Sequence, residues 1–244
     1  VYEIGKDGFL FRYDERKDSF QLVFDLKQRF PEFKKRPISA IYMDDANRTW
    51  FCIDQYIFLY DIAKNQVHQF THPLKGKITS ITQTHDDTIY YLAAERNLYK
   101  VSLKGNQMEK AEQIDLPPLQ LIDYIYYHQP SKMLVINNLL DELFIYDPQE
   151  RKLTSMGESM KDIGINTIIS DRLHPDTLYI ATDGKGIYRL DMKRQHLAPF
   201  LREDPHTPNK MNGNIIKDIY QDQSGRLWSV VYPTGITVYS EQYP

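Results

Sequence analysis

One stretch of this chain recurs with a period of about 40 to 50 residues, and no other feature restricts its fold as strongly. Each copy starts with an aromatic and apolar run, turns at small or polar residues, and ends in a second apolar run closed by Asp or Ser. The runs "LYIATDGKGIYRLD" (178–191) and "IYYLAAERNLYKVS" (89–102) show the pattern. The six copies start at Val1, Thr49, Ile89, Met133, Leu178 and Leu227.

Two further elements complete the repeat. A pair of Ile residues spaced three apart precedes five of the copies, and a more polar run, such as "QVHQFTH" or "KLTSMGES", follows them where the chain continues. Short Ile-rich runs bounded by turns fit strands buried on both faces better than helices. Polar runs at this position are typical of edge strands. The pairs are Ile38 and Ile41, Ile78 and Ile81, Ile122 and Ile125, Ile165 and Ile168, and Ile216 and Ile219.

A repeat of four short antiparallel strands predicts an all-β fold, a β-propeller of four-stranded blades. Four blades are complete; the first lacks its first strand and the last lacks its fourth. We expect one segment, 1–244, of a seven-bladed propeller, with closure of the two partial blades into a smaller ring as the alternative. The predicted blades span residues 1–37, 38–77, 78–120, 121–164, 165–214 and 215–244.

The charge and hydropathy of the chain limit the classes of partner that it can bind. The 244 residues carry a net charge of −3, so no general basic field attracts nucleic acid or an anionic membrane, and no nucleic-acid contact is expected. No apolar run is long enough to cross a bilayer. The start "VYEIGKDG" reads like mid-strand sequence, which predicts a segment of a longer protein. The single cysteine, Cys52, lies in an apolar run and is expected to be a buried hydrophobe.

The last repeat resembles a known family. "NIIKDIYQDQSGRLW" followed by "TGITVY" is similar to the two-component regulator propeller repeat, Ile-x-x-Ile-x-x-Asp-x-x-Gly-x-Leu-Trp-Ile-Gly-Thr … Gly-Leu-x-x-Tyr. The likeness is specific in the last two blades and degenerate in the middle ones. The family's Ile-Gly-Thr is replaced by Ser229-Val230-Val231 and, in an earlier blade, by Phe51-Cys52-Ile53.

This resemblance implies the periplasmic sensor region of a bacterial hybrid two-component system, whose parent resembles an inner-membrane sensor histidine kinase and response regulator. It further implies an oligosaccharide ligand, neighbouring propeller and immunoglobulin-like domains in the same chain, a homodimeric parent and a transcriptional output. The segment itself is expected to be non-catalytic and to need no cofactor. Two alternatives stay open: a structural, dimerising or protein-interaction propeller, and a propeller glycosidase or lyase.

Several polar groups have both a structural and a chemical interpretation. The paired carboxylates Asp44-Asp45 and Asp86-Asp87 suit acid–base work, but the repeat places both pairs in hairpin turns, where Asp bonds its own backbone. His68 and His72 are four apart, yet they lie in a strand-like run, so no metal site is expected. Gly184-Lys185-Gly186 reads as a turn, because no helix follows it to bind phosphate.

Aromatic residues and loop residues divide between core and rim. Trp50 and Trp228 share a repeat position with Tyr2, Tyr90 and Tyr179, which predicts that both tryptophans pack in the core. In propellers the loops between second and third strands lie on one rim, together with the connections between blades. The candidate ligand-binding residues on that rim are Tyr56, Arg96, Asn138, Asp183, Lys185 and Tyr232.

Overall fold

The computed structural model describes residues 1–70, 74–86, 88–139, 142–157, 160–204, 206 and 211–241. Its elements are almost all strands, with one short helix, α1 (Leu26–Arg29), and one 3-10 turn, η1 (Pro31–Phe33). No helix in these ranges has the length and apolar character needed to span a bilayer. The chain divides into two compact units, Val1–Pro118 and Leu119–Pro244.

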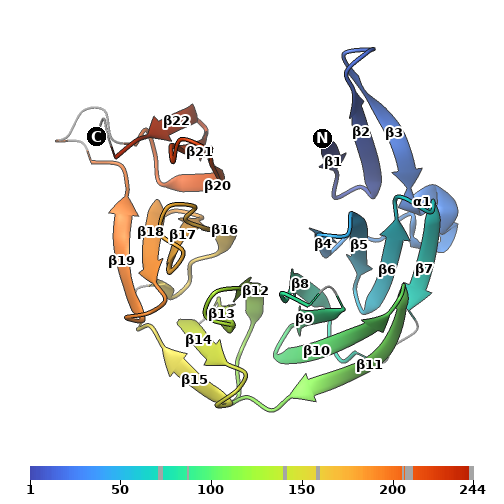
Figure 1. The fold of residues 1–244 in the computed structure, drawn as a ribbon, viewed down its shortest axis with the longest axis horizontal. Coiled ribbons are helices and arrows are strands. Elements are labelled where there is room, and N and C mark those ends of the chain that lie inside the picture. The colour runs from blue at the N-terminus through green and yellow to red at the C-terminus, as the bar shows by residue number, and fades with distance from the viewer. Residues whose placement is uncertain are drawn as a thin grey trace. The chain divides into compact units, whose positions relative to one another are not determined.

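Each unit contains three antiparallel sheets, which we number blades 1 to 6 in chain order (Figure 1). Within every sheet the strands follow one another in sequence, as in a meander. In the first unit, blade 1 is β1 (Tyr2–Ile4), β2 (Phe9–Asp14) and β3 (Ser19–Asp25); blade 2 is β4 (Ala40–Met43), β5 (Arg48–Ile53), β6 (Tyr56–Asp61) and β7 (Gln66–Phe70); blade 3 is β8 (Ile78–Gln83), β9 (Ile89–Ala94), β10 (Asn97–Lys104) and β11 (Gln107–Ile114).

In the second unit the last blade, instead of the first, has three strands. Blade 4 is β12 (Ile122–His128), β13 (Met133–Asn138), β14 (Leu143–Asp147) and β15 (Lys152–Ser155); blade 5 is β16 (Ile165–Ser170), β17 (Thr177–Thr182), β18 (Ile187–Asp191) and β19 (His196–Leu201); blade 6 is β20 (Ile215–Gln221), β21 (Leu227–Tyr232) and β22 (Gly235–Tyr239). Four blades have four strands and the first and last have three. The predicted β-propeller class, with two partial blades, is confirmed.

Strand β5 shows why the inner strands lack a clean polar alternation. All six of its residues are buried. Trp50 and Cys52 enter a core shared with blade 3, whereas Phe51 and Ile53 enter a core shared with blade 1. Successive side chains of a strand point to opposite faces, so a strand between two blades carries apolar residues on both faces, as β5 does from Trp50 to Ile53. The predicted burial of Cys52 is confirmed, and burial raises the pKa of its thiol.

Strand β21 of blade 6 behaves differently. Its residues alternate between buried and exposed, because one face packs on blade 5 through Leu227 and Val231 while the other face is open in this structure. Trp228 lies on the open face and is 37% exposed, whereas Trp50 is 0% exposed. The expectation that Trp228 is a core residue is therefore wrong here. Its repeat position is that of a core residue, but its side chain lies on the face of β21 opposite to the one that packs on blade 5.

Candidate functional site

The first strands of four blades share an irregularity near the predicted rim. Each register shifts after its first Ile, so one residue is bulged out of the pairing with the next strand. A bulge turns its side chain to a new direction and is frequent beside binding sites. All four bulged residues are polar: Thr79, Asp123, Asn166 and Lys217. Three of them lie on the successive blades 4, 5 and 6.

Asp123 of β12 is the most buried of these charges. Asn137 Nδ2 of the neighbouring strand β13 donates to Asp123 Oδ1 at 2.7 Å and also to the carbonyl oxygen of Ile163 at 3.1 Å. Burial raises the pKa of Asp123 to about 6, and the hydrogen bond from Asn137 opposes that rise only in part. The site therefore contains a carboxyl group that titrates close to neutral pH.

Blades 5 and 6 continue the cluster through Asp183 and Lys217. Lys217 Nζ bonds Asp183 Oδ1 at 2.9 Å, and the same ammonium lies 5.9 Å from the ring centroid of Tyr232. Asp183 donates its backbone N–H to the oxygen of Gly164 at 2.9 Å. A Cβ on Gly164 would lie 3.9 Å from both the Asp123 carboxylate and the Asp183 side chain, so this glycine separates the two acids.

We call these residues the rim cluster: Asp123, Asn137, Asn166, Asp183, Lys217 and Tyr232. Asn166 Nδ2 donates to the oxygen of Ile216 at 2.8 Å and so ties β16 to β20. Asp183, Lys217 and Tyr232 are 49%, 46% and 60% exposed, respectively. The exposed members therefore present a carboxylate, an ammonium and an aromatic ring, which can accept and donate hydrogen bonds and stack against a sugar ring, whereas Asn137 is 0% exposed and supports Asp123 from within.

The predicted site residues of the second unit fall in two groups. Asp183 and Tyr232 belong to the rim cluster. Lys185 lies in the same turn as Asp183, and its backbone N–H donates to Thr182 Oγ1 at 3.0 Å. Asn138 is 0% exposed, and its side-chain oxygen accepts the backbone N–H groups of Gln120 and Leu121. The side chain of Asn138 therefore binds the backbone that leads into β12 of its own unit and does not face solvent.

The predicted site residues of the first unit lie on blades 2 and 3. Tyr56 packs edge-on against Phe33, with ring centroids 5.0 Å apart, and Arg36 lies 5.9 Å from its centroid. Arg36 also pairs with Asp54 at 3.3 Å. Arg96 is exposed in the turn between β9 and β10.

The other polar groups have local partners. Asp44 and Asp86 accept backbone N–H groups of their own turns, those of Ala46 and Thr88. Gly184 and Gly186 donate their N–H groups to the oxygen of Asn214, which fixes a turn. Asp87 and His72 lie outside the described residues. Within the described ranges no three His, Cys, Asp or Glu residues form a group able to hold a metal ion.

The bulged residues Asp123, Asn166 and Lys217 were not among the predicted site residues. One signal was present: each polar residue follows the first Ile of an Ile-x-x-Ile pair. The bulge that turns this position toward the rim is a backbone irregularity, and the spacing of the Ile pair does not reveal it.

The fold and the rim cluster together define a β-propeller segment with a polar cluster on blades 4, 5 and 6. Similar solved structures include two of the extracellular domain of BT4673 from B. thetaiotaomicron, described in one as a candidate one-component system and in the other as a candidate hybrid two-component system. The first is 17% identical, with a TM-score of 0.51, and the match covers 98% of this chain and 37% of that one. The second is 16% identical, with a TM-score of 0.61, and the match covers 99% and 38%.

At these identities the likeness shows a shared fold. The chain spans less than two fifths of the length of those domains, at 37% and 38%. No protein-family model matches the sequence, and no curated protein matches it significantly.

Proposed function

We propose that this chain is a recognition segment of an extracytoplasmic sensor propeller, and that it acts by binding and not by catalysis. The observation that carries the proposal is the rim cluster, in which successive blades each turn a polar bulged residue toward the loops. Propellers and other repeat folds bind ligands with their loops, because the residues of their strands are buried between neighbouring repeats.

The ligand class that fits best is an oligosaccharide. The rim cluster combines carboxylate acceptors, a lysine donor and the exposed ring of Tyr232, which are groups that bind sugar hydroxyls and sugar faces. The resemblance of the last repeat to the two-component regulator propeller, and the description of the BT4673 extracellular domain, support a sensor that relays ligand binding to a cytoplasmic kinase. The relay would be a population shift, because the ligand prefers one arrangement of the sensor domains.

The experiment is calorimetry of the purified chain against a panel of oligosaccharides, followed by the same titration on Lys217→Met. We expect at least a tenfold loss of affinity, since the variant removes the ammonium that bonds Asp183 and faces Tyr232. Lys193→Met is the matched control, because Lys193 is exposed in the β18–β19 turn, outside the rim cluster. Equal losses for both variants, or no binding across the panel, contradict the proposal. Release of reducing ends would indicate an enzyme instead.

A second candidate, a structural or protein-interaction propeller, is favoured by one observation. Blade 6 presents an apolar open face that includes Trp228, Val230 and Ile236. If substitution of the rim cluster leaves signalling of the parent protein unchanged while substitution of this face abolishes it, the second candidate is the better one.

A further inference from the structure

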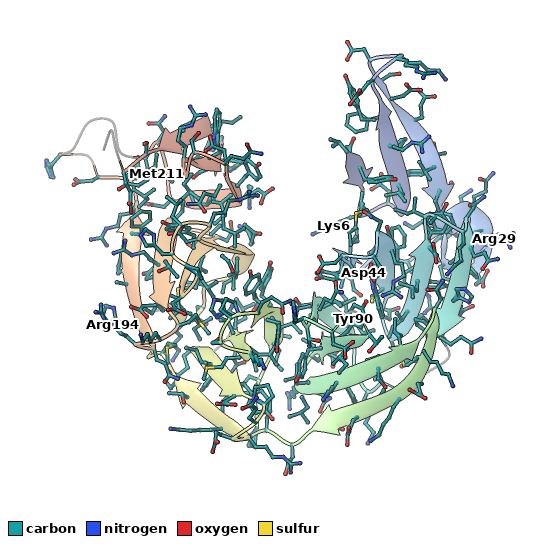
Figure 2. The ribbon with its side chains drawn as sticks, viewed as in Figure 1. Lys6, Arg29, Asp44, Tyr90, Arg194 and Met211 are labelled. Carbon is teal, nitrogen blue, oxygen red and sulfur yellow. The ribbon has the colours of Figure 1, made fainter. Side chains whose placement is uncertain are left out.

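Asp44 and Asp61, two of the most buried carboxylates among the described residues, each have a cationic partner. Asp44 is paired with Arg48 Nε at 2.8 Å and accepts a further hydrogen bond from the hydroxyl of Tyr90 at 2.9 Å. Figure 2 shows Asp44 and Tyr90 close together in the first unit. Asp61 is paired with Lys64 Nζ at 3.0 Å. A buried charge is costly without such a partner, so an unpaired one points to a function.

Asp123 of the rim cluster has no such partner. Its side chain is half-buried, and none of the ion pairs among the described residues includes it. It accepts a hydrogen bond from the neutral amide of Asn137 at 2.7 Å. The ammonium of Lys217, the cation of the rim cluster, bonds Asp183 at 2.9 Å instead. When it is ionised, Asp123 therefore gives this part of the rim an uncompensated negative charge.

Gly164 keeps a space between Asp123 and Asp183. A Cβ at Gly164 would lie 3.9 Å from Asp123 Oδ2 and 3.9 Å from the Cβ of Asp183. Since the glycine leaves that space free of a side chain, a ligand placed over it lies beside both carboxylates. Carboxylates accept hydrogen bonds and do not donate them, so they match the hydroxyl groups of a neutral sugar.

The other elements packed near Asp123 do not reverse this charge. The strand β13 contributes the uncharged Asn137, whose amide also donates to the carbonyl oxygen of Ile163 at 3.1 Å. Burial and, to a smaller degree, the negative charge of Asp218 in β20 raise the pKa of Tyr124, the residue next to Asp123 in β12. A carboxylate or sulfate group of a ligand beside Asp123 would therefore meet a like charge.

We propose that Asp123 is a specificity-determining residue of the rim, which admits neutral saccharides and excludes saccharides that carry a carboxylate or a sulfate. A repulsive charge that rejects the wrong ligand is a general source of specificity. This inference rests on the proposed function, because it concerns the class of saccharide that the same rim cluster binds.

Protonation of Asp123 should remove the exclusion. Burial raises the pKa of this carboxyl to about 6. The carboxyl is then mostly ionised at about pH 7.5 and mostly neutral at about pH 5, where the carboxylate of an acidic sugar is still ionised. We therefore expect an acidic saccharide to bind more tightly at the lower pH.

The experiment is calorimetry of this chain with two matched probes at both pH values. The probes are the neutral oligosaccharide that binds best in the panel and the same oligosaccharide with its C6 hydroxymethyl groups oxidised to carboxylates. At about pH 7.5 the oxidised probe should bind at least about tenfold more weakly than the neutral one. The ratio should fall at about pH 5, and in Asp123→Asn it should be small at both pH values, since the substitution removes the charge and keeps an acceptor oxygen for Asn137.

Asp176→Asn is the matched control, because Asp176 is exposed in the turn between β16 and β17, outside the rim cluster. Equal binding of the two probes at about pH 7.5 overturns this inference and leaves the proposed function in place. A ratio that stays unchanged in Asp123→Asn, or that Asp176→Asn lowers to the same extent, means that the exclusion does not come from Asp123. If no probe binds at either pH, the proposed function is wrong and this inference is wrong with it.

Discussion

Blades 2 and 6 carry the same seven-residue motif, Asp-x-x-x-Arg-x-Trp, at 44–50 and 222–228. The internal geometry is also nearly the same. The Arg Nε to Asp distance is 2.8 Å in blade 2 and 2.7 Å in blade 6, and the Trp Nε1 to Asp distance is 3.1 and 3.0 Å. The environments differ, because Trp50 is 0% and Trp228 is 37% exposed.

The difference separates what the local sequence determines from what a neighbouring blade adds. The hairpin turn and its three bonded side chains form in both blades, so they need only their own residues. In blade 2 the neighbouring blade 3 adds the hydrogen bonds of Tyr90 with Asp44 and of Gln83 with Asp45. Trp50 also packs against Phe70 of the outer strand β7 of its own blade. We therefore expect the same substitution to lower the free energy of unfolding more in blade 2 than in blade 6.

The largest difference is expected for the two tryptophans. Trp50→Ala should lower the free energy of unfolding by about 3–5 kcal/mol, because it leaves a cavity in a fully buried site. Trp228→Ala in this chain should cost about 1 kcal/mol or less, as surface substitutions do. Urea unfolding followed by circular dichroism measures both. Equal losses would show that Trp228 is covered in solution and that the two environments are alike.

The ion pairs should rank next. Asp44→Asn breaks a pair whose side chains are 0% and 10% exposed and should cost about 3–5 kcal/mol, since the buried Arg48 guanidinium loses its carboxylate partner. The Asp222–Arg226 pair is partly exposed, at 16% and 51%. Asp222→Asn in this chain should cost clearly less, and salt should screen it.

The measurement is the midpoint of urea unfolding at low and at high NaCl. If Asp222→Asn proves as costly as Asp44→Asn and equally insensitive to salt, then burial is not what distinguishes the two blades.

The sequence predicted the architecture because each copy of the repeat contains the residues that form the strands of one blade. Ile-x-x-Ile pairs such as Ile78 and Ile81 identify the first strands, and the aromatic and apolar runs identify the second and third. It predicted Trp50 as a core residue for the same reason. Trp228 was assigned to the core by the same rule, and the rule failed because burial depends on a second blade, which residues 222–239 do not encode.

The residues of the rim cluster differ in how far the sequence points to them. Asp183 and Tyr232 lie at loop positions, which the repeat assigns to one rim. Asp123 and Lys217 lie at bulges within strands, and the sequence pattern does not reveal a bulge. Asn138 lies at a loop position, yet its side chain satisfies the buried N–H groups of Gln120 and Leu121, which only the fold reveals.

A smaller effect is expected at the hydrogen bonds by which Gln221 of blade 6 binds Asp171 and Arg172 of blade 5. Gln221→Leu removes three hydrogen bonds, those with Arg172 N–H, Asp171 Oδ1 and the oxygen of Gly225, and leaves the Arg172 N–H without its partner, so we expect a loss of about 1–3 kcal/mol in urea unfolding. Gln223→Leu is the matched control, because Gln223 is exposed in the adjacent turn and should cost less than about 0.5 kcal/mol. If the two variants behave alike, the hydrogen bonds of Gln221 between blades 5 and 6 contribute nothing measurable to stability.

The smallest effect concerns the hydrogen bonds that Asp222 accepts from Arg226 and Trp228, and the titration of Asp222 measures it. The hydrogen bond from Trp228, aided by Arg226, lowers the pKa of Asp222 to about 2. A carboxyl whose pKa is depressed in the folded state stabilises the fold above its unfolded pKa of about 3.9, and that contribution is lost as the pH falls toward 2. Trp228→Phe should raise the pKa of Asp222 toward its ordinary value, as followed by carbon-13 NMR of the side-chain carboxyl. Tyr220→Phe, which changes a residue on the same open face, should leave the titration unchanged. An ordinary pKa for Asp222 in the unsubstituted chain would mean that the motif needs a covering blade to form, and blades 2 and 6 would then differ in local geometry as well as in burial.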